Sequence, residues 1–378
     1  MRFNSDLLIF LLVVGARFLI PLLIPRFPLP AIIACLIIDA ADQSIFQKYT
    51  SLDLANYQSY DKALDIYYLT VAYLSVIRNW RNGFAMEVAR FLWYYRLIGV
   101  VLFELLEQRF LLFVFPNTFE YYFIAYEAVR TCWDPRRLTR NAVLWMAGLI
   151  WVVIKLPQEW WIHIAQNDFT DFFQETIFGV EPGSPWGQTF SNRPVVAVAL
   201  VAAIIALVFA GRVGWKRLPS PDWSLRFDVD KPVPDVTIEE ALAGDPYYDE
   251  AKEGPALKWP IFEKIALISL VSLIFAQMLG IRLPNWQVFL ATALVVTINA
   301  GISHLFVRNG TEWGSLFIST VVLVAVNSIV LAVFAAWARD GRVNRAAAIF
   351  FGVLLTLIIV MYDRFRGQRS RRIAALAI

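Results

Sequence analysis

Long, almost uncharged apolar runs are the feature of this sequence that most restricts its fold. Segments 194–210 and 286–306, for example, contain no Asp, Glu, Lys or Arg. A helix needs about 20 mostly apolar residues to cross a hydrocarbon core roughly 30 Å thick. Only 17% of the 378 residues are charged, against about 25% in soluble domains. We therefore predict an all-α, polytopic transmembrane helix bundle whose main partner is the lipid bilayer.

Apolar segments that qualify as membrane spans occur along most of the chain. They cover residues 7–24, 30–44, 62–77, 91–115, 119–129, 142–156, 194–210, 262–279, 286–306, 316–337 and 346–362. Segment 119–129 is short, so the predicted number of spans is eleven if it crosses and ten if it is tilted or re-entrant. No small-residue cleavage site follows the first segment, which we expect to be retained as a span.

The distribution of lysine and arginine predicts an orientation, because short cytoplasmic loops carry an excess of both. Basic clusters lie at 78–90, 130–140, 212–217 and 364–372. An eleven-span path puts all of them on one side and leaves the acidic segment 157–193 outside; only the arginines of 339–345 oppose it. We therefore expect a multi-pass plasma-membrane protein with a cytoplasmic C-terminus.

A hydrophilic stretch divides the chain into three parts. Residues 1–214 form a membrane module of six or seven spans with several charged side chains, and 260–378 form an apolar four-span module with a basic tail. Residues 215–259 between them are acidic and proline-rich, with too few apolar residues to bury a core. We interpret them as a cytoplasmic linker, either a solvated tether or a docking segment for a protein partner.

Charged side chains inside the predicted spans require an explanation. An ionised group at the bilayer centre costs about 2.5–3.5 kcal/mol on insertion scales, so such residues face protein or water and usually find a partner. The residues that we consider as candidates for binding a substrate or an ion are Arg17, Asp39, Asp42, Asp61, Asp65, Arg96 and Glu104. Arg17 is expected to pair with Asp65 or with Glu104. The alternative is a static ion pair that fixes helix register.

Two aspartate pairs are expected at the same outer rim. Asp39 and Asp42 are three residues apart near the end of the second span, and Asp61 and Asp65 are four apart at the start of the third. Both spacings put the pair on one helical face. Four carboxylates there could bind a cation, hold a divalent metal together with phosphate, or act as general acids and bases. Solvated helix ends are the alternative.

Two further segments combine charge with aromatic residues. Glu127 and Arg130 are three residues apart, which predicts a local ion pair on a short helix. From Trp161 to Ile177, apolar residues recur at helical spacing, which predicts one amphipathic helix at the outer surface. It either lies on the membrane surface or packs over the bundle as a lid. His163 is interpreted as a packing residue.

The motifs that the sequence lacks narrow the function. It has no glycine-rich phosphate loop, no G-x-S-x-G, no H-E-x-x-H and no C-x-x-C, so it indicates no cofactor, no histidine- or cysteine-based metal site and no nucleic-acid partner. Three functions remain. The first is a transporter or channel-like protein whose buried polar path for a small molecule or ion consists of Arg17, Asp65, Arg96 and Glu104. The second is a membrane enzyme that acts on a lipid-linked substrate at the outer face through Asp39, Asp42, Asp61 and Asp65. The third is a structural subunit of a membrane complex.

Overall fold

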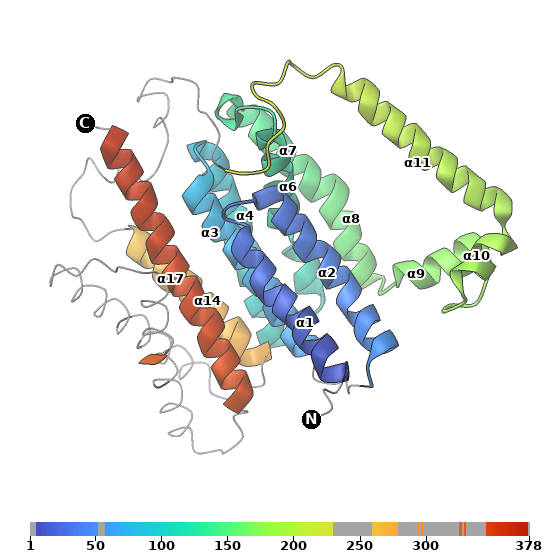
Figure 1. Ribbon diagram of the computed structural model, residues 1–378, viewed down its shortest axis with the longest axis horizontal. Helices are drawn as coiled ribbons and strands as arrows, with labels where there is room; N and C mark the ends of the chain where they lie inside the picture. Colours follow the sequence, from blue (N-terminus) through green and yellow to red (C-terminus); the bar gives the residue numbers. More distant parts are fainter. Residues whose placement is uncertain are drawn as a thin grey trace.

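The computed structural model describes residues 5–51, 57–229, 259–278 and 345–376, with isolated positions between 290 and 329, and all regular structure in these parts is helical (Figure 1). The predicted all-α class is confirmed for this part of the chain. Four of the described helices are long and apolar enough to cross a membrane. They are Ser5–Leu23, Pro28–Tyr49, Arg140–Ile164 and Pro194–Trp215. Ten or eleven crossings remain a prediction; spans 286–306 and 316–337 lie almost wholly outside the described residues.

Helices α1 (Ser5–Leu19) and α2 (Pro28–Tyr49) form an antiparallel hairpin, joined by the 3-10 turn Ile20–Leu23. Pro28 is the first residue of α2, a position where proline lacks only an amide that would have no helical partner. The Asp6 carboxylate accepts hydrogen bonds from the amide and hydroxyl of Ser51. That contact ties the start of α1 to the end of α2.

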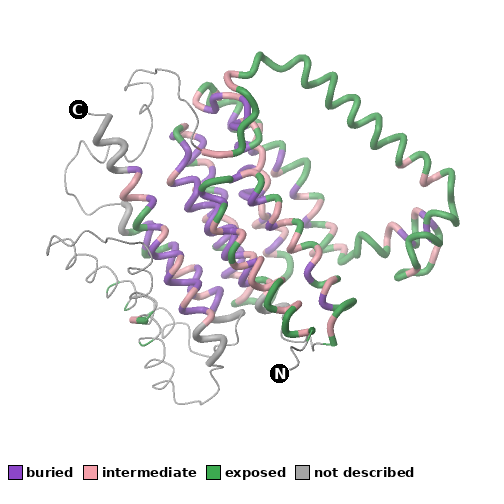
Figure 2. Tube along the Cα trace, viewed as in Figure 1, coloured by how far each residue is buried: buried purple, intermediate pink, exposed green. Residues whose placement is uncertain are grey.

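Helix α3 (Tyr57–Asn79) lies at the centre of the bundle, with α2, α4 (Gly83–Leu106), α14 (Trp259–Met278) and α17 (Arg345–Leu376) packed around it (Figure 1). Most of its residues from 63 to 77 are buried (Figure 2). Because α14 and α17 contribute to the same apolar core as α3 and α4, the C-terminal part of the chain packs directly on the N-terminal part.

The span predicted at 91–115 is divided. Helix α4 is capped by the Asn82 side chain, which accepts from the Ala85 amide, and it ends where Glu107 adopts a left-handed conformation with φ of 56°. The short helix α5 (Phe110–Val114) follows. The prediction of one uninterrupted helix was wrong because the polar residues Glu107, Gln108 and Arg109 interrupt the apolar run.

Helix α6 (Thr118–Arg130) packs against α4, α2 and the helix that begins at Arg140. Its 13 residues extend about 20 Å, less than the hydrocarbon thickness. Glu127 and Arg130 are 2.9 Å apart, which confirms the predicted local ion pair. Trp80 also donates to Glu127, at 2.7 Å, so this carboxylate joins α6 to the end of α3.

A single helical segment follows from Arg140 to Ile164, made of α7 (Arg140–Leu149), a π-helical stretch, α8 (Leu156–Glu159) and a second π-helical stretch. It is longer than the predicted span 142–156. The chain then breaks at Gln166, with φ of 52°, before α9 (Phe169–Phe172). The prediction of one amphipathic helix from Trp161 was wrong, because Trp161 belongs to the preceding helix.

Helix α11 (Pro194–Trp215) stands apart from the bundle and is exposed over almost its whole length (Figures 1 and 2). It follows the short α10 (Trp186–Asn192). After it, the Asp222 amide donates to the Cys132 carbonyl at 2.9 Å, and Arg137 pairs with Asp222 at 2.7 Å. The described start of the predicted linker therefore lies against the 131–137 turn and does not extend away from it; residues 230–258 lie outside the described residues.

The basic clusters gather at one end of the bundle. Arg369 of α17 donates to the carbonyls of Ile77 and Trp80 at 3.0 and 2.8 Å, at the end of α3. Asn82 donates to the Pro135 carbonyl, and the rings of Trp133 and Trp215 are 5.2 Å apart. These contacts bring together the basic loops from which the positive-inside rule predicts the orientation. The start of α1, the end of α2 and the start of α3 lie at the opposite end (Figure 1).

Candidate functional site

Arg17, near the end of α1, lies among four carboxylates. Its Nη2 donates to Asp39 at 2.6 Å and to Asp65 at 2.5 Å, and its Nη1 donates to Asp42 and Asp61. Arg17 itself is only 5% exposed. We call these residues the aspartate cluster. Three helices contribute to it, which places it inside the α1–α2–α3 unit.

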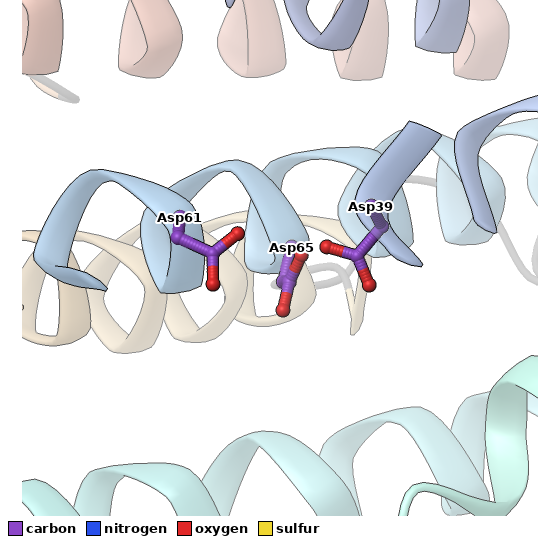
Figure 3. A group of neighbouring side chains, drawn as sticks. All are labelled: Asp39, Asp61 and Asp65. Atoms are coloured by element: carbon purple, nitrogen blue, oxygen red, sulfur yellow. The ribbon is translucent and has the colours of Figure 1, made fainter. Parts of the chain in front are cut away.

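The cluster forms because helical spacing and antiparallel packing bring the two aspartate pairs to one level. Asp39 and Asp42 share a face of α2, and Asp61 and Asp65 share a face of α3. Figure 3 shows Asp39 and Asp65 facing each other across the two helices. Asp61 and Asp65 are four and eight residues after the first residue of α3, about 6 and 12 Å along its axis. The cluster therefore lies within a few turns of the bundle end opposite the basic loops.

The four aspartates differ in exposure. The Asp42 side chain is 2% exposed, whereas those of Asp39, Asp61 and Asp65 are 30, 33 and 35% exposed. Asp42 also accepts from the Gln43 amide. We therefore separate a buried Arg17–Asp42 ion pair from an accessible group of three carboxylates, which we call the open triad.

Charge is not balanced in this cluster. Four ionised carboxylates and one guanidinium sum to −4 + 1 = −3. Like charges this close cannot all persist without added positive charge, either bound protons or a bound cation. One oxygen from each residue of the open triad lies within 4.8 Å of the others. Two ligands on opposite sides of a Ca²⁺ ion, at about 2.4 Å each, are separated by about this distance.

The structure assembles five of the seven candidates predicted from the sequence. The Arg17–Asp65 contact was predicted and is confirmed. Arg17 takes its ion-pair partners from the aspartates and not from Glu104, so that alternative was wrong. Glu104 lies half-buried on α4, within electrostatic range of Lys62. Arg96 donates to the Phe115 carbonyl at 3.0 Å.

A second polar group, which the sequence reasoning did not assemble, adjoins the aspartate cluster. Tyr68, three residues after Asp65 on α3, donates to Glu120 at 2.5 Å. Asn117 donates to Glu120 through its side-chain Nδ2 at 3.0 Å and to Glu159 through its backbone amide at 3.1 Å. These bonds form a continuous hydrogen-bonded series from α3 to the helix that carries Glu159.

Further side chains of this second polar group lie on the helical segment Arg140–Ile164. His163 lies 3.0 Å from Glu159, a polar contact that was not predicted. Lys155 is 4% exposed; its Nζ donates to Gln158 at 3.1 Å and lies 4.1 Å from the centre of the Tyr121 ring. The sequence did carry a signal: Lys155, Glu159 and His163 recur every four residues. Lys155 was overlooked because it coincides with the predicted end of span 142–156. We call Tyr68, Arg96, Asn117, Glu120, Lys155, Glu159 and His163 the polar seam.

No family model, curated protein or solved structure matches this chain. Its function is therefore argued from the aspartate cluster and the polar seam alone.

Proposed function

We propose that the chain is a membrane-embedded enzyme that binds a divalent cation at the open triad and acts on a phosphate-bearing, lipid-linked substrate. The convergence of Asp39, Asp61 and Asp65, with their oxygens within 4.8 Å of one another, carries this proposal. Of the three functions considered from the sequence, the enzyme is the one whose candidate aspartates lie close together.

The donor set indicates which cation would bind. Carboxylate oxygens suit Mg²⁺, Mn²⁺ and Ca²⁺, and Mg²⁺ is commonly held by one or two carboxylates together with substrate phosphate and water. Such an ion would offset most of the −3 charge and polarise a phosphoryl oxygen. The Arg17–Asp42 pair would hold α1 against α2, and the remaining Arg17 bonds would orient the open triad.

The position of the cluster favours a substrate that arrives from the bilayer. Asp61 and Asp65 lie about 6 and 12 Å from the start of α3, a depth that a lipid headgroup reaches from the interface. On the side of α1 away from Arg17, apolar side chains such as Leu8 and Leu12 are exposed, as expected for a helix in contact with lipid. With the basic end of the bundle in the cytoplasm of a plasma membrane, the cluster would face outward.

Transport is the second candidate, and the continuous hydrogen bonding of the polar seam favours it. A proton or cation path through the N-terminal module would pass from the open triad through Tyr68 and Glu120 to His163. It receives less support because the path first predicted also needs Glu104, which lies apart with Lys62.

The first experiment measures cation binding by the full chain in phosphatidylcholine nanodiscs, with Mn²⁺ followed by electron paramagnetic resonance. We expect wild type to bind Mn²⁺ and Asp61→Asn/Asp65→Asn to lose at least tenfold in affinity. Asp171→Asn, at an exposed site on α9, is the matched control. Equal affinity of wild type and the double variant would refute the cation site.

A second experiment separates enzyme from transporter. Cells that express wild type or Asp65→Asn at equal abundance are compared by lipid mass spectrometry. The enzyme predicts that at least one phosphate-bearing lipid accumulates with the variant. An unchanged lipid profile together with a Mn²⁺ affinity that depends on the open triad would contradict the enzyme and support cation transport.

A further inference from the structure

We infer that Lys155 and Arg96 form an anion-binding subsite beside the open triad, and that it takes the phosphate group of the substrate. The inference rests on the proposed function, since it assigns the second half of the same site. It comes from how the charged groups of the polar seam are paired.

The two carboxylates of the polar seam, Glu120 and Glu159, accept hydrogen bonds from groups other than Lys155 and Arg96. Glu120 accepts from the Tyr68 hydroxyl and the Asn117 side chain, at 2.5 and 3.0 Å. Glu159 accepts from the Asn117 amide at 3.1 Å and is 3.0 Å from His163. Both buried acids therefore have hydrogen-bond partners before a lysine or arginine is considered.

The cations, in turn, donate to neutral oxygens. Arg96 Nη1 donates to the Phe115 carbonyl and Lys155 Nζ to the Gln158 side chain. The closest ion-pair contact of Lys155 is 4.0 Å, to Glu159, beyond the 2.7–2.9 Å of a charge-assisted hydrogen bond. A lysine that is 4% exposed normally has a close anionic partner. Glu120 and Glu159 act on Lys155 electrostatically, and an anion from outside the chain would accept the charge-assisted hydrogen bond that neither of them takes.

Unsatisfied polar atoms gather at the same place. The donor Arg96 Nε and the hydroxyl Thr118 Oγ1 are buried and have no hydrogen-bond partner among the residues that the structure describes; the acceptor Asn117 Oδ1 is in the same situation. Thr118 is 1% exposed and is the first residue of α6, and the Phe115 carbonyl that Arg96 bonds precedes it by three residues. Buried polar atoms without partners are rare and indicate an additional water, ion or ligand.

The chemistry of these donors fits phosphate. An arginine Nε, an ammonium and a hydroxyl donate to several phosphate oxygens at once. Asp39 acts electrostatically on both Glu120 and Tyr68, so the two halves of the site are near neighbours. A cation on the open triad and a phosphate on Lys155 and Arg96 would complement each other in charge.

The test uses the full chain in phosphatidylcholine nanodiscs, with inorganic pyrophosphate as the probe. Calorimetry measures pyrophosphate affinity in the presence of Mn²⁺, and electron paramagnetic resonance measures Mn²⁺ affinity. We expect Lys155→Met to weaken pyrophosphate binding at least tenfold and to change Mn²⁺ affinity less than twofold. Lys155→Arg should retain most of the affinity, and the exposed Lys216→Met is the control.

Each outcome separates the inference from the function on which it rests. No Mn²⁺ binding by wild type would contradict the proposed function itself. Mn²⁺ binding without pyrophosphate binding, or pyrophosphate affinity that Lys155→Met leaves within twofold of wild type, would overturn the subsite alone. If Lys155→Met does not fold, the same criterion applies to Arg96→Lys, which keeps the charge and removes Nε. Nanodiscs that also contain phosphatidic acid identify the source: competition supports a lipid phosphate, and unaltered pyrophosphate binding contradicts it.

Discussion

Replacing Arg17 by glutamine removes the only positive charge that contacts the aspartate cluster among the described residues. Asp42, which is 2% exposed, would then lose its ion pair with Arg17. Breaking a buried pair in this way costs about 3–5 kcal/mol, because the remaining charge stays desolvated. We expect Arg17→Gln to lower the free energy of unfolding by that amount, which is a large part of the total for a typical domain.

A divalent cation should reverse part of this loss. Without the guanidinium the formal charge of the cluster changes from −3 to −4, and its affinity for a cation rises. A ligand at 100 times its dissociation constant stabilises the folded state by about 2.7 kcal/mol. The stabilisation by Mn²⁺ should therefore be larger in Arg17→Gln than in wild type.

Reversible unfolding in mixed detergent micelles, with and without Mn²⁺, measures both effects. Arg26→Gln is the matched control, because Arg26 is exposed in the turn after α1 and such substitutions usually change stability by less than about 0.5 kcal/mol. An Arg17→Gln protein within 1 kcal/mol of wild type would refute the argument that the cluster depends on this charge. Equal stabilisation of both proteins by Mn²⁺ would refute its charge dependence.

Three further changes test other parts of the structure. Hydrogen bonds from Arg136 outweigh the effect of burial and hold the pKa of Asp134 below its usual range. The stability that this provides is present in full above the unfolded-state pKa of about 4 and is lost as the pH falls through the lower pKa of the folded state. Asp134→Asn should therefore lower Tm more at pH 7 than at pH 3. A Cβ atom at Gly99 would lie 2.1 Å from Cβ of Phe115, so Gly99→Val should cost at least about 1–3 kcal/mol in unfolding free energy, whereas Gly148→Val, with no contact there, should cost much less. Glu263 is 4% exposed and accepts hydrogen bonds from Tyr73 and from Arg90 of α4. Glu263→Leu should lower the free energy of unfolding by about 3–5 kcal/mol. An unchanged Tm would show that Glu263 does not join α14 to the bundle.

Much of the described architecture could be predicted from the sequence because its cause is local. Apolar runs of span length predict helices, and the i,i+3 spacing of Glu127 and Arg130 predicted their pairing. The aspartates could be assigned to one rim because two helices joined by a short connection must bring the end of one close to the start of the next. These inferences needed only chain direction and helical period.

The sequence did not predict the tertiary contacts, because these depend on how the helices pack against one another. The partners of Arg17 depend on the rotation of α1 about its axis, which packing against α2 and α3 decides. Lys155 sits where hydropathy alone suggests the end of a span, yet its burial follows from the contact between this helix and α6. Glu107 in a left-handed conformation divides a segment whose average apolarity suggested one helix.

The unequal burial of the aspartates separates what holds the fold from what remains for chemistry. A purely architectural ion pair needs one carboxylate for one guanidinium, and the buried Asp42 meets that need for Arg17. The open triad adds three carboxylates that are each about a third exposed and also bond Arg17. Their bonds join α1 to α2 and α3, but one guanidinium leaves the four carboxylates with a formal charge of −3. Lys155 shows the opposite imbalance in its hydrogen bonding: Glu120 and Glu159 act on it electrostatically, but its hydrogen bond goes to the neutral Gln158 side chain. A ligand that unites a divalent cation with phosphate would correct both imbalances at once, which is why we assign the two groups to one site.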